Sequence, residues 1–236
     1  MLRCYLLVML GLVLLLAGCD RYPRDPGESL DHINQRGVLR VGASPAEPWV
    51  VKSAGGELGG AEGRLIEQFA DTLGVQVDTY WSGEEDLFQM LGNRDIDVVV
   101  AGMSRHNPWS ARAGFTLPYY TNHLIVGLPA QSPPLADLEG VTVGILHGSP
   151  LSGVLEEKGA VVTKVEDLAT ASLPVAGPAW QIRQSGLTPT AIRLDARAHV
   201  MAVPRGENAL LLRLERFLFA RSQARIEALL GEEATR

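Results

Sequence analysis

The sequence lacks an excess of positive charge: its 236 residues hold 21 Lys and Arg against 27 Asp and Glu, a formal net charge of −6. Nucleic-acid binding depends on a clustered positive surface, so this balance argues against DNA or RNA as the main partner. The chain also lacks internal repeats and low-complexity tracts. With 46% hydrophobic and 20% charged residues, its composition is that of one large or two small globular domains.

Motifs typical of enzymes are missing as well. No Ser-His-Asp order, metal-ligand spacing or nucleotide-binding glycine loop stands out. The histidines are scattered, with no HxxxH or HExxH pair, at His32, His106, His123, His147 and His199. We therefore expect no catalytic residue, no metal and no cofactor, although Glu62 or His147 could be recruited for acid–base work.

Cysteine is rare, because only Cys4 and Cys19 occur. Cys19 ends the segment MLRCYLLVMLGLVLLLAGC, in which Arg3 gives a short positive start and residues 5–16 form an apolar run. This run of about a dozen residues is shorter than the ~20 that a membrane-spanning helix needs. Its ending, Leu-Ala-Gly-Cys, resembles the lipobox of bacterial lipoproteins, in which the cysteine is acylated and becomes the first mature residue.

The N-terminal pattern therefore predicts a signal peptide over residues 1–18 and lipidation of Cys19 by fatty acids such as palmitate. The alternative is an ordinary cleaved signal peptide in which Cys19 is incidental. The predicted mature chain keeps no free thiol, which excludes disulfides and thiolate metal sites. Acyl chains would hold it on the periplasmic face of a membrane, and Asp20 resembles a signal for retention at the inner membrane. Residues 19–29 are predicted to form a tether.

The first half of the folded region alternates predicted strands and helices. Runs of β-branched and apolar residues predict three strands, at residues 38–44, 75–81 and 97–103. Amphipathic spacing predicts two helices, over residues 63–73 and 82–91. Ser82 and Glu85 have the spacing of a capping box at the start of the second helix. The β-α-β-α-β order predicts a parallel α/β sheet with right-handed crossovers.

The pattern then repeats with different content. Further strands are predicted at residues 124–128, 141–146, 161–165 and 199–204. Helices are predicted at residues 149–158, as two short helices within 167–186, and as one long helix from 207 to about 230. We therefore expect an α/β fold of two lobes, in which a first lobe of residues 30–122 and 203–232 is interrupted by a second lobe of residues 123–202.

Three segments together resemble the bacterial extracellular solute-binding proteins of family 3, over about residues 30–220. They read GVLRVG followed by SP and PW, then DIDVVVAGMS followed by FTLPYY, then LEGVTVG, GS and AVPRGEN, and they lie within residues 37–49, 95–120 and 138–208. These proteins are the periplasmic receptors of polar amino acid importers. The same fold also occurs as the N-terminal module of a membrane-bound lytic transglycosylase, whose second, lysozyme-like domain we do not expect in this chain.

The resemblance implies a periplasmic-binding-protein-like fold. Its two α/β lobes would be joined by two crossing strands, near residues 120–127 and 194–202, which act as the hinge. Binding of a small molecule would shift an equilibrium between open and closed lobes. The expected ligand site is the cleft between the lobes.

In the first lobe, the resemblance implies ligand contacts at three places. Trp49 takes the position of an aromatic residue that stacks on the ligand, or else it covers the edge of the core. Glu62 takes the position of an acid, which could instead cap the following helix. The sequence Gly102-Met103-Ser104 ends a predicted strand, where parallel sheets bind ligands through backbone groups and hydroxyls.

Two ionic contacts of the family have no counterpart. The arginine that binds an α-carboxylate falls on Trp109, and indole cannot replace a guanidinium; Arg105 or Arg112 could reach the cleft instead. In the second lobe, the aspartate that receives the ligand's ammonium group falls in LPVAGP, residues 173–178, which holds no acid. The site is therefore expected to suit a less charged or more aromatic ligand, or to have lost ligand binding.

The last candidates lie at the start of the second lobe. Gly148 and Ser149 follow a predicted strand, Ser149 fits a helix N-cap with Pro150 in the first turn, and the matching turn of the family binds a carboxylate. His147 precedes them and could point into the cleft.

The sequence therefore predicts a lipid-anchored periplasmic solute-binding protein. It would serve an ABC-type importer of a small polar or aromatic solute, as a monomer that binds an inner-membrane permease. The alternative is a degenerate binding module that acts as an accessory or sensory lipoprotein through protein contacts.

Overall fold

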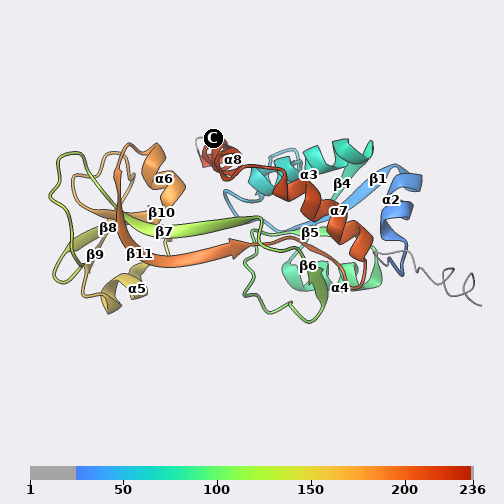
Figure 1. Ribbon diagram of the computed structural model, residues 1–236, viewed down its shortest axis with the longest axis horizontal. Helices are drawn as coiled ribbons and strands as arrows, with labels where there is room; N and C mark the ends of the chain where they lie inside the picture. The colour runs from blue at the N-terminus through green and yellow to red at the C-terminus, as the bar shows by residue number, and fades with distance from the viewer. Residues whose placement is uncertain (1–24, 235–236) are drawn as a thin grey trace, which may run out of the picture.

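The computed structural model describes residues 25–234, and the predicted signal peptide and Cys19 lie outside this range. Two α/β lobes lie along the long axis of the molecule and are joined by two long strands, β7 (Tyr120–Leu128) and β11 (Thr188–His199) (Figure 1). This arrangement confirms the predicted two-lobed fold. Within residues 25–234, every helix is too short or too polar to cross a bilayer.

The first lobe is built on a five-stranded sheet in the order β4-β1-β5-β12-β6. Its strands are β1 (Val38–Ala43), β4 (Gln76–Trp81), β5 (Val98–Val100), β6 (Ala113–Phe115) and β12 (Ala202–Pro204). The first three are parallel, as predicted, whereas β12 runs antiparallel to both β5 and β6. The helices of this lobe are α2 (Ser29–Arg36), α3 (Gly60–Leu73), α4 (Glu84–Asn93) and α7 (Asn208–Phe219), and a short hairpin of β2 (Val51–Lys52) and β3 (Leu58–Gly59) precedes α3.

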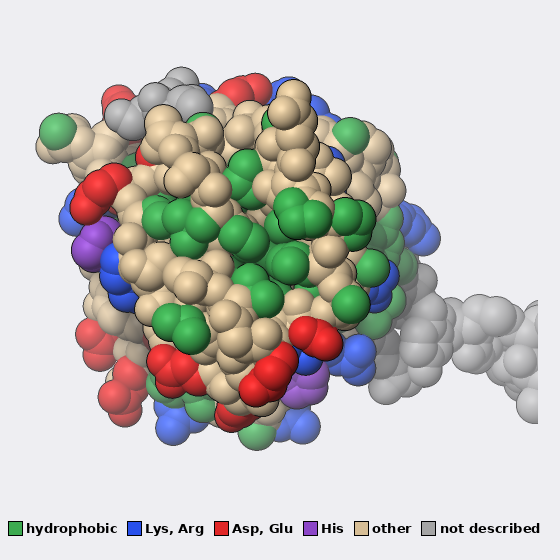
Figure 2. Space-filling model, turned by 90° about the vertical axis from the view of Figure 1, so that its left-hand side faces the viewer, with side chains coloured by type: hydrophobic (Ala, Val, Ile, Leu, Met, Phe, Trp, Pro, Cys, Tyr) green, Lys and Arg blue, Asp and Glu red, His purple; other side chains and the backbone are tan. Residues whose placement is uncertain are grey.

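The second lobe is built on another five-stranded sheet, in the order β11-β7-β10-β8-β9. Its remaining strands are β8 (Thr142–Leu146), β9 (Val161–Val165) and β10 (Val175–Pro178), and its helices are α5 (Ser152–Glu157) and α6 (Ala179–Gln184). Strands β8 and β9 are parallel, and β7 lies antiparallel between β10 and β11. Apolar side chains gather in the middle of the face that ends this lobe (Figure 2).

The two long strands pair with each other from Thr188 opposite Leu128 to His199 opposite Tyr120. The pairing carries them out of the second sheet to the first, where Thr116 and Met201 exchange hydrogen bonds through the Thr116 backbone and hydroxyl. Because these strands run through both lobes, the lobe boundaries given above stay predictions.

The C-terminal region forms two helices where one long helix was predicted. Helix α7 ends at Phe219, and α8 (Gln223–Ala234) begins after a short break. Helix α8 packs against α3 of the first lobe and α6 of the second. The Glu227 carboxylate accepts hydrogen bonds from the Tyr120 hydroxyl at 3.2 Å and from Arg183 at 2.6 Å, so this helix is fastened beside the hinge.

Three further local predictions are wrong. Residues 167–186 form a strand and one helix rather than two helices. The capping box is absent, because Gly83 is the N-cap of α4 and the Ser82 hydroxyl bonds Asp86 at 2.8 Å. Ser149 is not an N-cap either, since α5 begins after Leu151.

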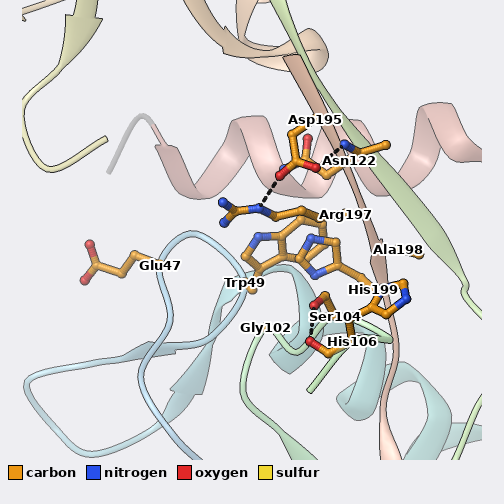
Figure 3. Close-up of a pocket in the computed structure, with 11 residues that line it drawn as sticks. Glu47, Trp49, Gly102, Ser104, His106, Asn122, Asp195, Arg197, Ala198 and His199 are labelled. Carbon is orange, nitrogen blue, oxygen red and sulfur yellow. Dashed lines mark hydrogen bonds and ion pairs between the residues drawn. The ribbon is translucent and has the colours of Figure 1, made fainter. Parts of the chain in front are cut away.

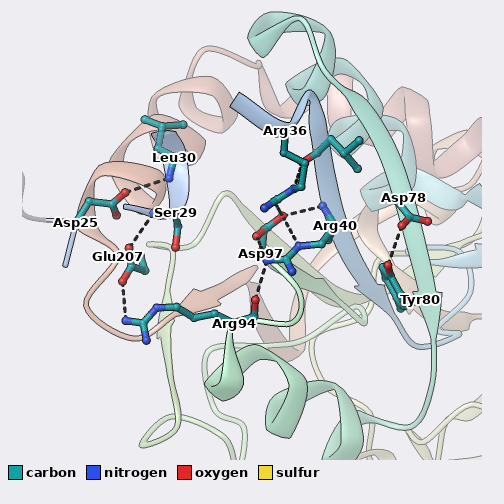
Figure 4. Close-up of polar contacts among 11 residues, drawn as sticks. Asp25, Ser29, Leu30, Arg36, Arg40, Asp78, Tyr80, Arg94, Asp97 and Glu207 are labelled. Atoms are coloured by element: carbon teal, nitrogen blue, oxygen red, sulfur yellow. Dashed lines mark hydrogen bonds and ion pairs between the residues drawn. The ribbon is translucent and has the colours of Figure 1, made fainter. Parts of the chain in front are cut away.

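Polar contacts fix the start of the described chain (Figure 4). The buried Glu207 carboxylate accepts hydrogen bonds from the backbone of Gly27 at 2.8 Å and Ser29 at 3.3 Å, and pairs with Arg94 at 2.8 Å. Residues 27–29, placed at the end of the predicted tether, are therefore bound to the first lobe.

Candidate functional site

A cavity of about 470 Å³ lies where the hinge strands meet the first lobe (Figure 3). We call it the hinge cavity, and it is lined by Glu47, Trp49, Gly102, Ser104, His106, Asn122, Asp195, Ala196, Arg197, Ala198 and His199. Four elements supply these residues: the loop after β1, the loop after β5 and the two hinge strands. Of the residues predicted for the site, Trp49, Gly102 and Ser104 line it.

Two further cavities continue from the hinge cavity between the lobes. The first, of about 750 Å³, shares Glu47 with it and is also lined by Pro48 and Ser53 of the first lobe and by Pro178 and Trp180 of the second. The next, of about 250 Å³, is lined by the predicted residues His147, Gly148 and Ser149 of the second lobe. Neighbouring cavities share lining residues and so form one interlobe cleft. Trp49, Gly102 and Ser104 line it from the first lobe, and residues 147–149 line it from the second.

Trp49 does not present a free aromatic face to the cleft. The loop after β1 turns tightly, with Ala46 and Val50 bridged, and buries the indole. The His199 imidazole stacks on it with ring centroids 3.6 Å apart, and Tyr120 lies against it at 5.7 Å. The predicted stacking of a ligand on Trp49 stays a prediction, and in this conformation His199 occupies a face of the ring.

His199 is buried in the wall of the cavity and neutral at physiological pH. Burial and the positive charge of Arg197 lower the pKa of its imidazole to about 4. Neither ring nitrogen has a hydrogen-bond partner of good geometry among the described residues. The ring therefore acts as a packing surface with unused polar atoms, which is a costly arrangement unless another molecule or water bonds them.

Gly102 lies at the centre of the first-lobe wall in a left-handed conformation, with φ +60°. A side chain there would approach the Cβ atoms of Ala46 and Trp49 at 3.0 and 3.2 Å. Ser104 also lines the cavity, and its hydroxyl donates to the His106 carbonyl at 3.2 Å. Met103 instead points into the hydrophobic core of the first lobe, so it does not line the cavity.

Glu62 lies behind the cavity wall. Its fully buried carboxylate accepts hydrogen bonds from the Tyr119 hydroxyl at 2.7 Å and the Gly102 N–H at 3.0 Å. Burial raises the pKa of Glu62 to about 7, although the two hydrogen bonds oppose the rise. Glu62 lies in the first turn of α3, as the alternative interpretation expected, but Gly59 is the N-cap and no side chain caps the helix. The Glu62 carboxylate instead supports Gly102.

Trp109, which stands where the family has its carboxylate-binding arginine, lies away from all three cavities. Its ring stacks on Phe88 at 4.9 Å, its Nε1–H donates to Glu84 at 2.6 Å, and the Arg112 guanidinium lies over it at 5.2 Å. The segment after Ser104 thus anchors to α4 of the first lobe. Trp109 therefore has a packing role in this conformation.

In the second lobe, His147 and Glu166 form an exposed pair at 3.2 Å. The Ser149 backbone N–H donates a hydrogen bond to the Leu146 carbonyl at 3.1 Å and so closes the turn after β8. These contacts hold the turn at the mouth of the cleft and leave its side chains accessible.

Asn122, Asp195 and Arg197 in the cavity were not predicted from the sequence. All three lie on the hinge strands, and Asp195, Arg197 and His199 alternate with Ala196 and Ala198 along β11. The period of two along a strand, which places alternate residues on one face, is the signal that could have found them. Among residues 25–234, no cluster of His, Cys, Asp or Glu could hold a metal ion.

The sequence matches the family described as bacterial extracellular solute-binding proteins, family 3, over residues 39–230. The chain belongs to this family. The predicted family resemblance is thus confirmed, and the interlobe cleft is the cleft of a family 3 solute-binding protein.

Relatives found by sequence similarity are longer proteins than this chain. The chain is 34% identical over 100 residues to a membrane-bound lytic murein transglycosylase F of Vibrio vulnificus (strain YJ016), covering 42% of this chain and 18% of the relative. It is 30% identical over 162 residues to the protein of the same name of Yersinia enterocolitica, covering 64% and 33%. This family 3 protein therefore spans a third or less of the length of these relatives.

Two solved structures of similar fold are a solute receptor and a solute binding protein. The L-cystine solute receptor of Neisseria gonorrhoeae, in the unliganded open conformation, has a TM-score of 0.65 at 18% identity, covering 87% of this chain and 95% of the receptor. An ancestral cationic amino acid solute binding protein has a TM-score of 0.64 at 18% identity, covering 86% and 98%. At these identities the likeness shows the fold.

Proposed function

We propose that this chain is a lipid-anchored periplasmic solute-binding protein that closes its two lobes over a small polar or aromatic solute and delivers it to an ABC-type importer. The observation that carries the proposal is the series of cavities between lobes that are joined by two strands. A hinge of this kind allows the two walls to close on a ligand. We assign the protein no catalytic role, because its family and its structural neighbours are binding proteins.

Solute binding is tested by thermal shift of the purified full chain in mild detergent. The panel contains amino acids, amines, organic acids and aromatic solutes. A ligand at a thousand times its Kd stabilises the folded state by about 4 kcal/mol. We expect at least one class to raise the melting temperature in a saturable way.

A matched pair of variants places that binding in the hinge cavity. Ala196→Trp puts an indole on the cavity wall, whereas Ala191→Trp puts one on the same strand in a hollow at the far end of the second lobe. Ala196→Trp should abolish the shift and Ala191→Trp should keep it. A shift that survives Ala196→Trp would place the ligand elsewhere.

The lipid anchor rests on the sequence around Cys19 and on the periplasmic location of the family. It is tested by growing cells with labelled palmitate. We expect the chain to carry the label and to sediment with the inner membrane, and Cys19→Ser to lose both properties. An unlabelled chain in the soluble periplasmic fraction would refute the anchor.

A second candidate function is an accessory lipoprotein module that acts through protein contacts. Two observations favour it: His199 fills the face of Trp49, and Trp109 stands in place of the family's arginine with its ring packed on Phe88. The apolar side chains grouped at the end of the second lobe offer a surface of the kind that binds proteins (Figure 2). A flat thermal response to every solute class would favour this candidate.

A further inference from the structure

The hinge strand β11 brings into the cleft a charged pair that the sequence did not indicate. Asp195 and Arg197 lie two residues apart on β11, both line the hinge cavity, and the Asp195 carboxylate bonds Arg197 Nε at 3.2 Å (Figure 3). On the neighbouring strand, Asn122 is the partner of Arg197 in the register and lines the same cavity. Directly paired residues on adjacent strands have their side chains on one face within reach of each other.

Arg197 is the single Lys or Arg among the described residues that line the three cleft cavities. Of the other candidate cations, Arg112 lies over Trp109 and Arg183 pairs with Glu227. Arg105 is exposed beside Ser104, with its backbone N–H on the Ala198 carbonyl at 2.7 Å, and its side chain does not line these cavities. A negatively charged group that entered the cleft would therefore find one guanidinium, and it would find it at the hinge.

The ion pair that now holds Arg197 is easily exchanged. Both side chains are 46% exposed, and an exposed pair of this kind contributes little to stability. Asp195 Oδ1 also accepts a hydrogen bond from the backbone N–H of Ala196 at 2.7 Å, so the carboxylate keeps a partner after it releases Arg197. The Asp195 carboxylate thus stands where an incoming carboxylate could bind.

Unused polar atoms surround this position. The Oδ1 atom of Asn122 and both ring nitrogens of His199 are buried at the cavity wall without a hydrogen-bond partner of good geometry. Buried polar atoms without a partner are rare in folded proteins, and a bound water or polar group is one explanation for them. Asn122 and His199 line the same cavity as Arg197, whose planar guanidinium matches the two oxygens of a carboxylate.

We propose that Arg197 binds the carboxylate of the solute, by exchange with Asp195, and so takes over the task that the family gives to the residue at position 109. The inference rests on the proposed function, since it requires that a solute enters the cleft. It names the solute class as carboxylates and Arg197 and Asp195 as the residues that determine specificity. Because Arg197 lies on a hinge strand, the bound carboxylate contacts the element about which the lobes rotate.

The test compares carboxylate probes with amides and amines of the same shape: benzoate with benzamide, glutarate with glutaramide, and L-phenylalanine with L-phenylalaninamide and phenethylamine. The affinity of the full chain for each probe is measured by thermal shift and calorimetry. Arg197→Gln removes the cation, and Asp195→Asn removes the competing carboxylate. Arg193→Gln is the matched control, because it removes an exposed arginine of the same strand that does not line the cavity.

The expected result is that carboxylate probes bind and their amides and amines bind at least tenfold more weakly. Arg197→Gln should weaken carboxylate binding by 10- to 100-fold, the range expected for losing charge-assisted hydrogen bonds. Asp195→Asn should strengthen it several-fold, and Arg193→Gln should leave it unchanged. Circular dichroism and the melting temperature without probe confirm that each variant is folded.

Two outcomes would overturn the inference, and only the second would also overturn the proposed function. If amides or amines bind as well as carboxylates, or if Arg197→Gln binds carboxylates like the parent chain, the assignment of Arg197 is wrong while solute binding stands. If no probe and no solute of the wider panel binds, the proposed function fails and the inference fails with it.

Discussion

Replacing Glu62 by glutamine should change how the stability of the protein depends on pH. The carboxylate is fully buried between the Tyr119 hydroxyl and the Gly102 N–H, and its pKa is raised from an ordinary value of 4.5 to about 7. Between these two values the folded state keeps a proton that the unfolded state has lost. The free energy of unfolding therefore falls as the pH rises through this window.

The size of the effect follows from the interval between the two pKa values. At about 1.4 kcal/mol for each pH unit, the interval from 4.5 to 7 corresponds to roughly 3 kcal/mol of stability lost on the way to neutral pH. Glutamine has no proton to lose. Its amide keeps an oxygen for Gly102 and can bond the Tyr119 hydroxyl. The difference in unfolding free energy between Glu62→Gln and the parent chain should therefore grow by roughly 3 kcal/mol as the pH rises from 4 to 8.

The test must compare the unfolding free energies of Glu62→Gln and the parent chain at each pH, because His199 changes the stability with pH in the opposite direction. Burial and Arg197 lower the pKa of His199 to about 4, so between pH 4 and 6.5 the unfolded state binds the extra proton and stability rises with pH. The two contributions offset each other in the parent chain. Both chains of the comparison keep His199, so its contribution cancels in the difference.

The assay is urea unfolding followed by tryptophan fluorescence at unit steps from pH 4 to pH 8. Glu67→Gln is the control, since it removes a half-exposed glutamate from the same helix and measures the general effect of that loss of charge. A difference between Glu62→Gln and the parent chain that varies by less than 1 kcal/mol across this range would refute the burial argument.

Three other substitutions test the packing around the site. Trp109→Arg should lower the free energy of unfolding by about 3 kcal/mol in urea titrations, through loss of the stack on Phe88, and should confer no binding of amino acids by calorimetry. Gly102→Ala should cost about 1–2 kcal/mol in the same titrations because its φ is +60°, and it should lower the affinity of any bound solute. Glu207→Ala should cost about 3–5 kcal/mol, because Arg94 and the backbone at residues 27–29 lose their acceptor. Limited proteolysis of this variant should cut near residues 27–29. For any of the three variants, unchanged stability would contradict the contact on which the prediction depends, as would unchanged resistance to proteolysis for Glu207→Ala.

The sequence predicted the elements whose pattern is local. Strands such as β1 and β9 are rich in valine, so their positions could be read from the residues alone. It missed the length of β11, because that strand is mostly exposed and carries charged residues in place of the apolar alternation that marks a half-buried strand. The break between α7 and α8 was also missed, since the residues at 220–222 include neither Gly nor Pro.

The candidate site could be predicted only in outline. The position of Trp49 and of the Gly102 turn follows from where strands end, and both line the cavity. Sequence spacing could not show that the partner of Glu62 is a backbone N–H forty residues away, or that the ring at position 109 turns towards Phe88. These two contacts depend on tertiary packing, which determines where a side chain points and which the local sequence does not encode.

Helix α8 determines which parts of the molecule would travel furthest during a domain rotation. Its residue Glu227 bonds Tyr120 of a hinge strand and Arg183 of the second lobe, so α8 lies close to the axis about which the lobes would rotate. Atoms near α8 would therefore move little. Helix α2 and strand β9 lie at opposite tips and would sweep the longest arcs (Figure 1). Fluorophores attached to those two tips would give the largest change in energy transfer, whereas a pair of dyes flanking α8 would register almost none.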